Sequence, residues 1–158
     1  MITMRPANPE ERDWLFKLHR TTMHELVEQV WGWDDAVQQR FFQNHLAAGN
    51  HSVIEQNGEI IGTVQIHRHD DHIFIGNIEI DPAFQGIGIG SEIIRSLMAE
   101  ANASGHPVCL QVLKVNDRAR RLYERLGFVI TESTETHHRM TTSVRAARDS
   151  ANIFRSPA

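Results

Sequence analysis

Three glycines alternate with isoleucines between a β-rich stretch and a helical pattern. The run reads Gly86-Ile87-Gly88-Ile89-Gly90 and follows Asp81-Pro82, which ends the strand pattern. Glycine has no Cβ, so the backbone can turn tightly here and direct several N–H groups at one anion. The start of the next helix adds a partial positive charge. The backbone around Gly86, Gly88 and Gly90 is therefore predicted to hold a diphosphate.

Two other phosphate-binding loops do not fit this stretch. A Walker loop ends in Gly-Lys-Ser/Thr, whereas Gly90 is followed by Ser91-Glu92 and the lysine is missing. A Rossmann loop has the spacing Gly-x-Gly-x-x-Gly and an acidic residue about 20 residues later. This chain has Cys109-Leu110-Gln111 at that distance. The loop therefore predicts neither a nucleotide triphosphatase nor a dinucleotide enzyme.

A second pattern lies further along the chain. It fits Asn-x-x-Ala-x-x-x-Tyr-x-x-x-Gly-Phe, and its fixed positions are Asn116, Ala119, Tyr123, Gly127 and Phe128. The glycine loop fits Gln/Arg-x-x-Gly-x-Gly/Ala through Gln85, Gly88 and Gly90. These two patterns, in this order and between residues 75 and 130, resemble the two signatures of the GCN5-related N-acetyltransferase (GNAT) family.

The resemblance implies a fold and a cosubstrate. It implies one α/β domain over residues 1–144, with a mixed central sheet of about six to seven strands and about four flanking helices. Two neighbouring parallel strands would splay apart to form a cleft for acetyl-coenzyme A (acetyl-CoA). The backbone of Ile78 and Ile80 would meet pantetheine, and the Ile80 N–H would polarise the thioester carbonyl. The residues implied to bind acetyl-CoA are Ile78, Ile80, Gln85, Gly86, Ile87, Gly88, Ile89, Gly90, Ser91, Asn116 and Ala119.

Acetyl transfer to an amine needs two proton transfers, one from the acceptor and one to the leaving thiolate. The resemblance implies that Tyr123 is the acid, and the alternative is a core aromatic. Glu79 is the candidate base, although strand alternation turns it away from Ile78 and Ile80. An ordinary exposed strand glutamate is the alternative. Asn116, two helical turns before Tyr123, can cap its helix and also bind pantetheine.

Acceptor recognition in this family normally involves the N-terminal helices. Trp31 and Trp33, with Glu28 nearby, are predicted to form a pocket for a cationic amine, unless the tryptophans only pack against the core. Ribosomal-protein alanine acetyltransferases of the family carry a catalytic glutamate five residues before the motif asparagine. That position is Gln111 here, which cannot take a proton. We therefore expect Gln111 to contact the substrate, with Glu79 or a water relay acting as the base.

The pattern of apolar residues and turn signals predicts the elements that position these groups. A strand is predicted at residues 2–5, followed by helices that start after Asn8 and after Asp34-Asp35, the first interrupted at Thr21-Thr22. Asn57-Gly58 predicts a hairpin between residues 51–56 and 59–67. The later elements are predicted as a strand to residue 81, a helix after the loop, a strand at 108–113, a helix at 117–126, and strands at 128–135 and 138–143.

Composition agrees with a single enzyme domain. The 158 residues are 41% hydrophobic and 23% charged, and the formal charge of −4 gives no support for a nucleic-acid partner. Cys109 is the only cysteine and no apolar stretch suits export or membrane insertion, so a cytoplasmic protein without a membrane partner is expected. We expect no metal site at His67, His69 and His72. The tail, residues 145–158, has weak periodicity and is expected to be mobile.

The resulting functional prediction is acetyl transfer from acetyl-CoA to a primary amine of a small molecule or a protein. The amine would attack directly in a ternary complex, with the protein acting as a monomer or homodimer. The alternative is a non-catalytic domain that binds or senses acyl-CoA. Retention of Tyr123 and Asn116 argues against that alternative.

Overall fold

The computed structural model describes residues 1–144, which divide into two compact units. The first unit comprises residues 1–67 and 75–90, and the second comprises 68–74 and 91–144 of the described chain. The described residues hold seven strands and four α-helices, in agreement with the predicted α/β class and element numbers. The predicted tail, residues 145–158, lies outside the described residues.

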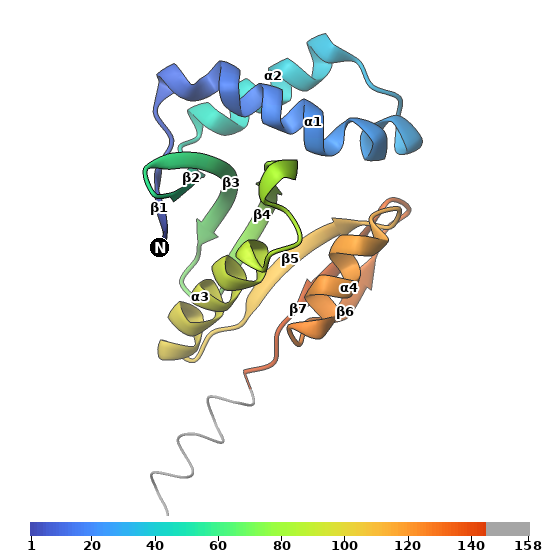
Figure 1. The fold of residues 1–158 in the computed structure, drawn as a ribbon. Coiled ribbons are helices and arrows are strands. Elements are labelled where there is room, and N and C mark those ends of the chain that lie inside the picture. The colour runs from blue at the N-terminus through green and yellow to red at the C-terminus, as the bar shows by residue number, and fades with distance from the viewer. Residues whose placement is uncertain (145–158) are drawn as a thin grey trace, which may run out of the picture. The chain divides into compact units, whose positions relative to one another are not determined.

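Four strands, which belong to the first unit except for residues 68 and 73–74, follow the order β1 (Ile2–Pro6), β2 (His51–Gln56), β3 (Glu59–Arg68) and β4 (Ile73–Ile80) (Figure 1). The β1–β2 and β2–β3 pairs are antiparallel. Asn57 and Gly58 have φ angles of 53° and 81°, as a two-residue turn with two positive φ angles requires. The predicted hairpin is therefore confirmed.

Two helices of the first unit, α1 (Arg12–Val30) and α2 (Asp35–Ala47), lie next to each other (Figure 1). A 3-10 turn at Pro9–Glu11 leads into α1, and the Glu11 carboxylate accepts a hydrogen bond from the Asn8 N–H at 2.8 Å. The predicted interruption at Thr21-Thr22 is wrong. The Thr21 hydroxyl donates to the Lys17 carbonyl at 3.0 Å inside a continuous helix, which satisfies the side chain without breaking the turn.

The helices bury an aromatic cluster against β2. Leu15, Phe16, Phe42 and Val53 form this cluster, and the rings of Phe16 and Phe42 meet edge to face with centroids 5.7 Å apart. The cluster joins α1 and α2 to the strand, because burial of apolar surface is the main favourable term in folding. No described helix combines the length and the apolar character needed to cross a membrane.

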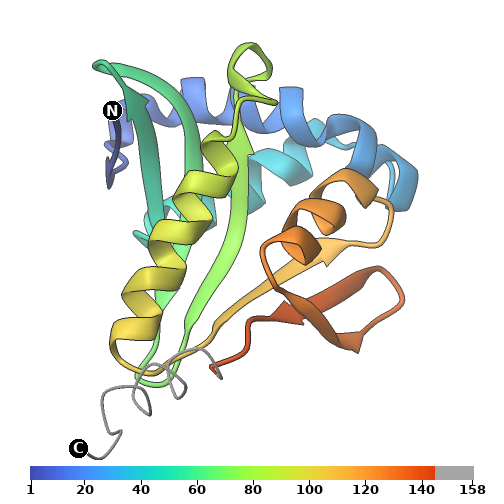
Figure 2. The same cartoon turned by 60° about the horizontal axis from the view of Figure 1, so that its bottom comes forward.

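The second unit holds α3 (Ile89–Ala103) from residue 91 onward, β5 (Val108–Leu113), α4 (Asp117–Arg125), β6 (Val129–Ser133) and β7 (His137–Thr141). The strand order is β5-β7-β6 with antiparallel neighbours, and Figure 2 shows α4 beside the β6–β7 hairpin. Cys109 is buried in β5.

Candidate active site

The predicted diphosphate loop begins directly after β4, where two side chains shape the backbone. The Asp81 carboxylate accepts a hydrogen bond from the Ala83 N–H at 2.9 Å and starts the short 3-10 turn Pro82–Phe84. The Gln85 amide then donates from Nε2 to the Ile80 carbonyl at 2.8 Å. Gln85, the first residue of the loop pattern, therefore anchors the loop to the end of β4.

The glycines of this loop leave several backbone donors without a partner among residues 1–144. Gly86 and Gly88 have φ angles of 78° and 89°, which a residue with a side chain adopts only with strain. Among the described residues, none accepts a hydrogen bond from the N–H of Gly86, Ile87 or Gly88. The first N–H groups of α3, including Ser91, also lack partners within the helix. Together these donors suit an anion at a helix N-terminus.

Glu79 is buried near the end of β4, with its side chain only 2% exposed. Its Oε2 atom accepts two hydrogen bonds, from Nδ1 of His19 at 2.7 Å and from Nδ2 of Asn77 at 3.0 Å. Because Asn77 and Glu79 are two residues apart, both side chains point to the same face of the strand. Because Glu79 is buried, the alternative of an exposed strand glutamate is wrong. The two hydrogen bonds offset the cost of burying its carboxylate.

His19 connects Glu79 to both N-terminal helices. It projects from α1, and its second ring nitrogen, Nε2, lies 3.0 Å from Oε1 of Gln38 on α2. Burial lowers the pKa of His19, but the hydrogen bond and the charge of Glu79 outweigh burial and raise that pKa above its ordinary value. The ring of Phe42 lies 5.7 Å from the imidazole, centroid to centroid.

No pattern in the sequence marks His19 as a site residue. It is separated from Glu79 by 60 positions, so no local spacing connects the two side chains. The available signal was its place on the helix, three residues after Phe16 and four after Leu15, on the buried face of α1. A histidine in that stripe needs polar partners, and the chain supplies them from β4 and α2.

The two tryptophans between α1 and α2 differ in their surroundings. The backbone N–H of Trp33 donates a hydrogen bond to Oε2 of Glu28 at 2.6 Å. The indole ring of Trp33 packs against the ring of His24, with centroids 4.9 Å apart. Trp33 also packs against the aromatic cluster, which is the predicted alternative role. Trp31 is 59% exposed. Binding of an acceptor amine by Trp31, Trp33 and Glu28 stays a prediction.

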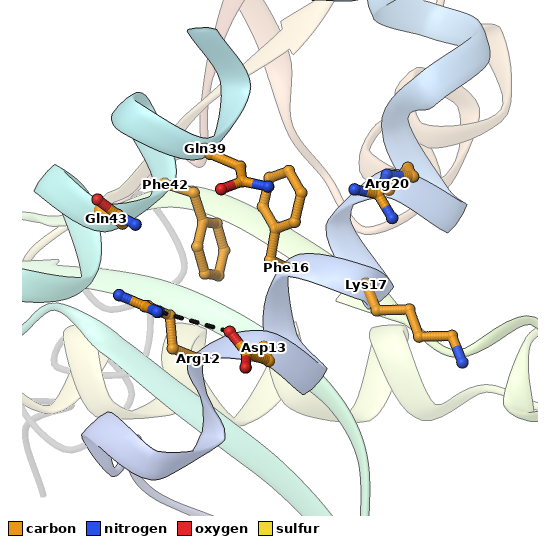
Figure 3. A pocket seen from close by; sticks show the side chains of 8 residues that line it. All are labelled: Arg12, Asp13, Phe16, Lys17, Arg20, Gln39, Phe42 and Gln43. Carbon is orange, nitrogen blue, oxygen red and sulfur yellow. Dashed lines mark ion pairs between the residues drawn. The ribbon is translucent and has the colours of Figure 1, made fainter. Parts of the chain in front are cut away.

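A cavity of about 270 Å³ opens between α1 and α2. Figure 3 shows Phe16 and Phe42 side by side, with Arg12 and Asp13 joined by an ion pair of 3.6 Å. The residues that line the cavity are Arg12, Asp13, Phe16, Lys17, Arg20, Gln39, Phe42 and Gln43. None of the residues predicted to bind the acceptor is part of this lining.

In the second unit, Asn116 caps the helix that carries Tyr123. Its side-chain Oδ1 accepts a hydrogen bond from the Ala119 N–H at 3.2 Å, which confirms the predicted capping role. This contact uses the amide oxygen and explains the three-residue spacing of the pattern. The Nδ2 group of Asn116 is the part of the side chain that its predicted contact with pantetheine would use.

Tyr123 is buried on α4 and packs against Phe128, with ring centroids 5.9 Å apart. Gly127 has a φ angle of 98° and ends the helix, so that the Phe128 N–H returns to the Tyr123 carbonyl at 3.0 Å. Burial raises the pKa of Tyr123 to about 12. The phenol is therefore protonated at neutral pH, as an acid must be, while its role as an acid stays a prediction.

Gln111 is exposed on β5 and lies opposite Arg139 of β7 in the strand register. Its contact with substrate stays a prediction. The histidines near residue 70 form a small surface group, in which His69 and His72 stack with centroids 4.4 Å apart. Within residues 1–144, no group of three or more His, Cys, Asp or Glu side chains is placed to hold a metal ion.

The chain is similar in sequence to known acetyltransferases. The model of the acetyltransferase (GNAT) family matches residues 13–128. The N-alpha-acetyltransferase RimI of Mycobacterium tuberculosis is 34% identical over 110 residues, which cover 66% of this chain and 68% of that protein. The spore coat polysaccharide biosynthesis protein SpsD of Bacillus subtilis is 31% identical over 87 residues, which cover 54% of this chain but only 30% of SpsD.

Solved structures show the same fold. The PaiA N-acetyltransferase from Thermoplasma acidophilum, in complex with coenzyme A, superposes with a TM-score of 0.72. The match covers 90% of this chain and 99% of that chain at 12% identity. At this identity the likeness concerns the arrangement of the elements and leaves the acceptor open.

Proposed function

Because the chain belongs to the GNAT acetyltransferase family, we propose that it transfers an acetyl group from acetyl-CoA directly to a primary amine. Bound acetyl-CoA supplies a thioester whose carbonyl an amine can attack. No residue of the chain needs to form a covalent intermediate in this reaction. The lone cysteine is buried in β5, which agrees with a direct attack.

The loop between β4 and α3 is the observation that carries this proposal. The N–H groups of Gly86, Ile87 and Gly88 have no acceptor in the described part of the chain and precede a helix N-terminus. This arrangement fits the diphosphate of coenzyme A. Gln85 holds the loop against Ile80, whose N–H is the predicted donor to the thioester carbonyl. The coenzyme A bound to the PaiA structure supports the same choice of cosubstrate.

We assign the two proton transfers to Glu79 and Tyr123. Glu79 is a carboxylate held by neighbouring side chains, which suits a base that must keep one orientation. Tyr123 keeps its proton at neutral pH and can give it to the leaving thiolate. Asn116 caps α4 with its oxygen and would use its NH₂ group for pantetheine.

The acceptor is a primary amine of a protein or a small molecule. Similarity to the N-alpha-acetyltransferase RimI of Mycobacterium tuberculosis supports the N-terminal amine of a protein as the acceptor. Gln111 stands where the ribosomal-protein alanine acetyltransferases carry their catalytic glutamate. Because an amide cannot accept the proton, the base of this protein must be a different group. A cytoplasmic location, the absence of a nucleic-acid partner and a monomeric or homodimeric state remain predictions from the sequence.

The test is a measurement of free thiol released from acetyl-CoA in the presence of candidate amines. The panel contains peptides with free N-termini, polyamines, amino acids, aminoglycosides and arylamines, and hydrolysis without acceptor is subtracted. Amine-dependent release is expected, and it would identify the acceptor class. Tight acetyl-CoA binding by folded protein, without release for any amine, would instead favour the acyl-CoA sensing function.

A further inference from the structure

The hydrogen bonds of Glu79 divide its two oxygens. Both bonds to the carboxylate, from His19 and Asn77, end on Oε2. Oε1 accepts no hydrogen bond from any of the described residues. A carboxylate held in this way has one oxygen that fixes its orientation and a second oxygen that can receive a proton.

The partners of His19 are suited to both protonation states of its ring. Nδ1 faces the Glu79 carboxylate, and Nε2 faces the amide oxygen of Gln38, so the imidazolium finds an acceptor at each nitrogen. Rotation of the Gln38 amide by half a turn presents its NH₂ group instead. The neutral ring, protonated at Nδ1, then also has two partners. His19 can therefore change its charge without losing a hydrogen bond.

The other groups around His19 add little charge. From α2 it meets Gln38 and Phe42, and from the loop before α2 it meets Trp33, all of which are uncharged. A further titratable group that interacts with His19 is His51 on β2, which packs edge to face against Phe42. Burial lowers the pKa of His51, so this residue stays neutral at neutral pH. Glu79 therefore governs the charge of His19.

We propose that His19 is a positioning residue that aims Glu79 at the acceptor's proton when its ring is neutral and disables Glu79 as a base when its ring is protonated. This inference rests on the proposed acetyl transfer. With neutral His19, Glu79 is a buried anion, and taking up a proton removes that buried charge. With protonated His19, proton uptake by Glu79 would leave a buried cation without its counter-ion.

The acceptor arrives as an ammonium ion, and one of its N–H bonds breaks while the electron pair stays on nitrogen. Because the Glu79 side chain is only 2% exposed, one bridging water passes the proton to Oε1. The neutral amine then attacks the thioester carbonyl, and its C–N bond forms as the C–S bond breaks with the electron pair going to sulfur. The thiolate takes the Tyr123 proton, and the second proton lost by the amine nitrogen restores the phenol by way of water. Glu79 returns its proton to solvent after the products leave.

The first test is independent of catalysis. An NMR titration of the His19 imidazole in the full chain is expected to give a pKa above the ordinary value of about 6.5. In Glu79→Gln the raising interaction is lost while burial remains, so the pKa should fall below that value. A His19 that titrates at its ordinary pKa in the wild-type protein would overturn the proposal without any variant having to fold.

The second test is the pH dependence of kcat/KM with the best amine of the panel. In the wild type, the rate should fall about tenfold per pH unit below the pKa that NMR gives for His19. His19→Gln keeps a donor to Oε2 but does not titrate, so this acidic limb should disappear. His19→Ala removes the donor, so at pH values above the His19 pKa its kcat/KM should lie roughly tenfold or more below that of the wild type.

The matched control is His45→Gln on α2, an exposed histidine bonded to the Phe41 carbonyl, which should retain the wild-type limb. An acidic limb that persists unchanged in His19→Gln contradicts the role of His19 and leaves the proposed acetyl transfer intact. If folded wild-type protein shows no amine-dependent turnover, both the proposed function and this role are overturned.

Discussion

Gly62 on β3 lies so close to Glu79 on β4 that a Cβ atom at Gly62 would be 2.5 Å from the Glu79 carbonyl oxygen. The same atom would lie 3.3 Å from the Cα of Ile80. Only glycine leaves room for β4 at this point, because the obstacle is backbone that cannot rotate aside. The missing side chain at Gly62 therefore helps to set the position of the buried carboxylate and of the residue after it.

Gly62→Ala should destabilise the protein and also impair catalysis. The added methyl group must push β4 away, and overpacking of this kind costs about 1–3 kcal/mol. The shift would move Glu79 relative to His19, so kcat should fall. Urea unfolding and steady-state kinetics measure the two effects. The control is Gly76→Ala, whose methyl group would meet the movable side chain of Gln65, and we expect a smaller loss of stability there.

Gly88→Ala should weaken acetyl-CoA binding beyond its effect on stability. Gly88 has a φ angle of 89° with open space around it, so alanine adds backbone strain of about 1–2 kcal/mol but no clash. Relief of the strain would turn the loop amides away from the diphosphate. Loss of one hydrogen bond to a charged group corresponds to roughly a tenfold rise in Kd.

Gly105→Ala is the matched control for this loop variant. Gly105 has a φ angle of 72°, also with open space, in the turn after α3. Its substitution should lower the free energy of unfolding by a similar amount while acetyl-CoA binding stays unchanged. Calorimetric titration with acetyl-CoA distinguishes the two variants, and equal affinities would remove the Gly88 turn from the binding site.

Tyr123→Phe should lower kcat and leave the affinity for acetyl-CoA nearly unchanged. The phenylalanine ring keeps the packing against Phe128, whereas the proton donor is lost. General acid catalysis typically contributes about 10²–10⁴-fold to the rate, so kcat of Tyr123→Phe should fall by a factor near this range. Steady-state kinetics near neutral pH measure the change, and acetyl-CoA titration provides the control. Equal kcat values for both proteins would exclude Tyr123 as the acid.

Tyr123 should also make the fold sensitive to alkaline pH. Its pKa is raised to about 12 in the folded state, compared with about 10 in the unfolded chain. Above pH 10 the unfolded state loses its proton first, so stability falls as the pH rises from about 10 to about 12. The full loss approaches about 3 kcal/mol, and Tyr123→Phe should abolish it.

The measurement is direct because Tyr123 is the only tyrosine in the chain. Phenolate absorbance therefore reports this residue alone, and urea unfolding at several pH values gives the stability. A phenol that titrates near pH 10 in folded protein would contradict the effect of burial.

Elements governed by neighbouring residues were predictable from the sequence. Asn57-Gly58 forms the hairpin turn because both residues accept positive φ, and the strands on either side follow from it. The spacing of Asn116 and Ala119 reflects a cap inside one helix. Gly86 and Gly88 turn the loop as their lack of a side chain allows. In each case the interacting residues lie within a few positions of one another, so the sequence pattern alone predicts their arrangement.

The tertiary structure decided which distant groups meet. Strand alternation places Glu79 on one face of β4, but its burial depends on α1. That helix carries His19, which bonds Glu79 although the two residues are 60 positions apart in the sequence. Trp31 and Trp33 look alike in the sequence, yet one is exposed and the other packs against the aromatic cluster. Such contacts arise when apolar faces of separate elements are buried together, and local spacing does not specify which faces those are.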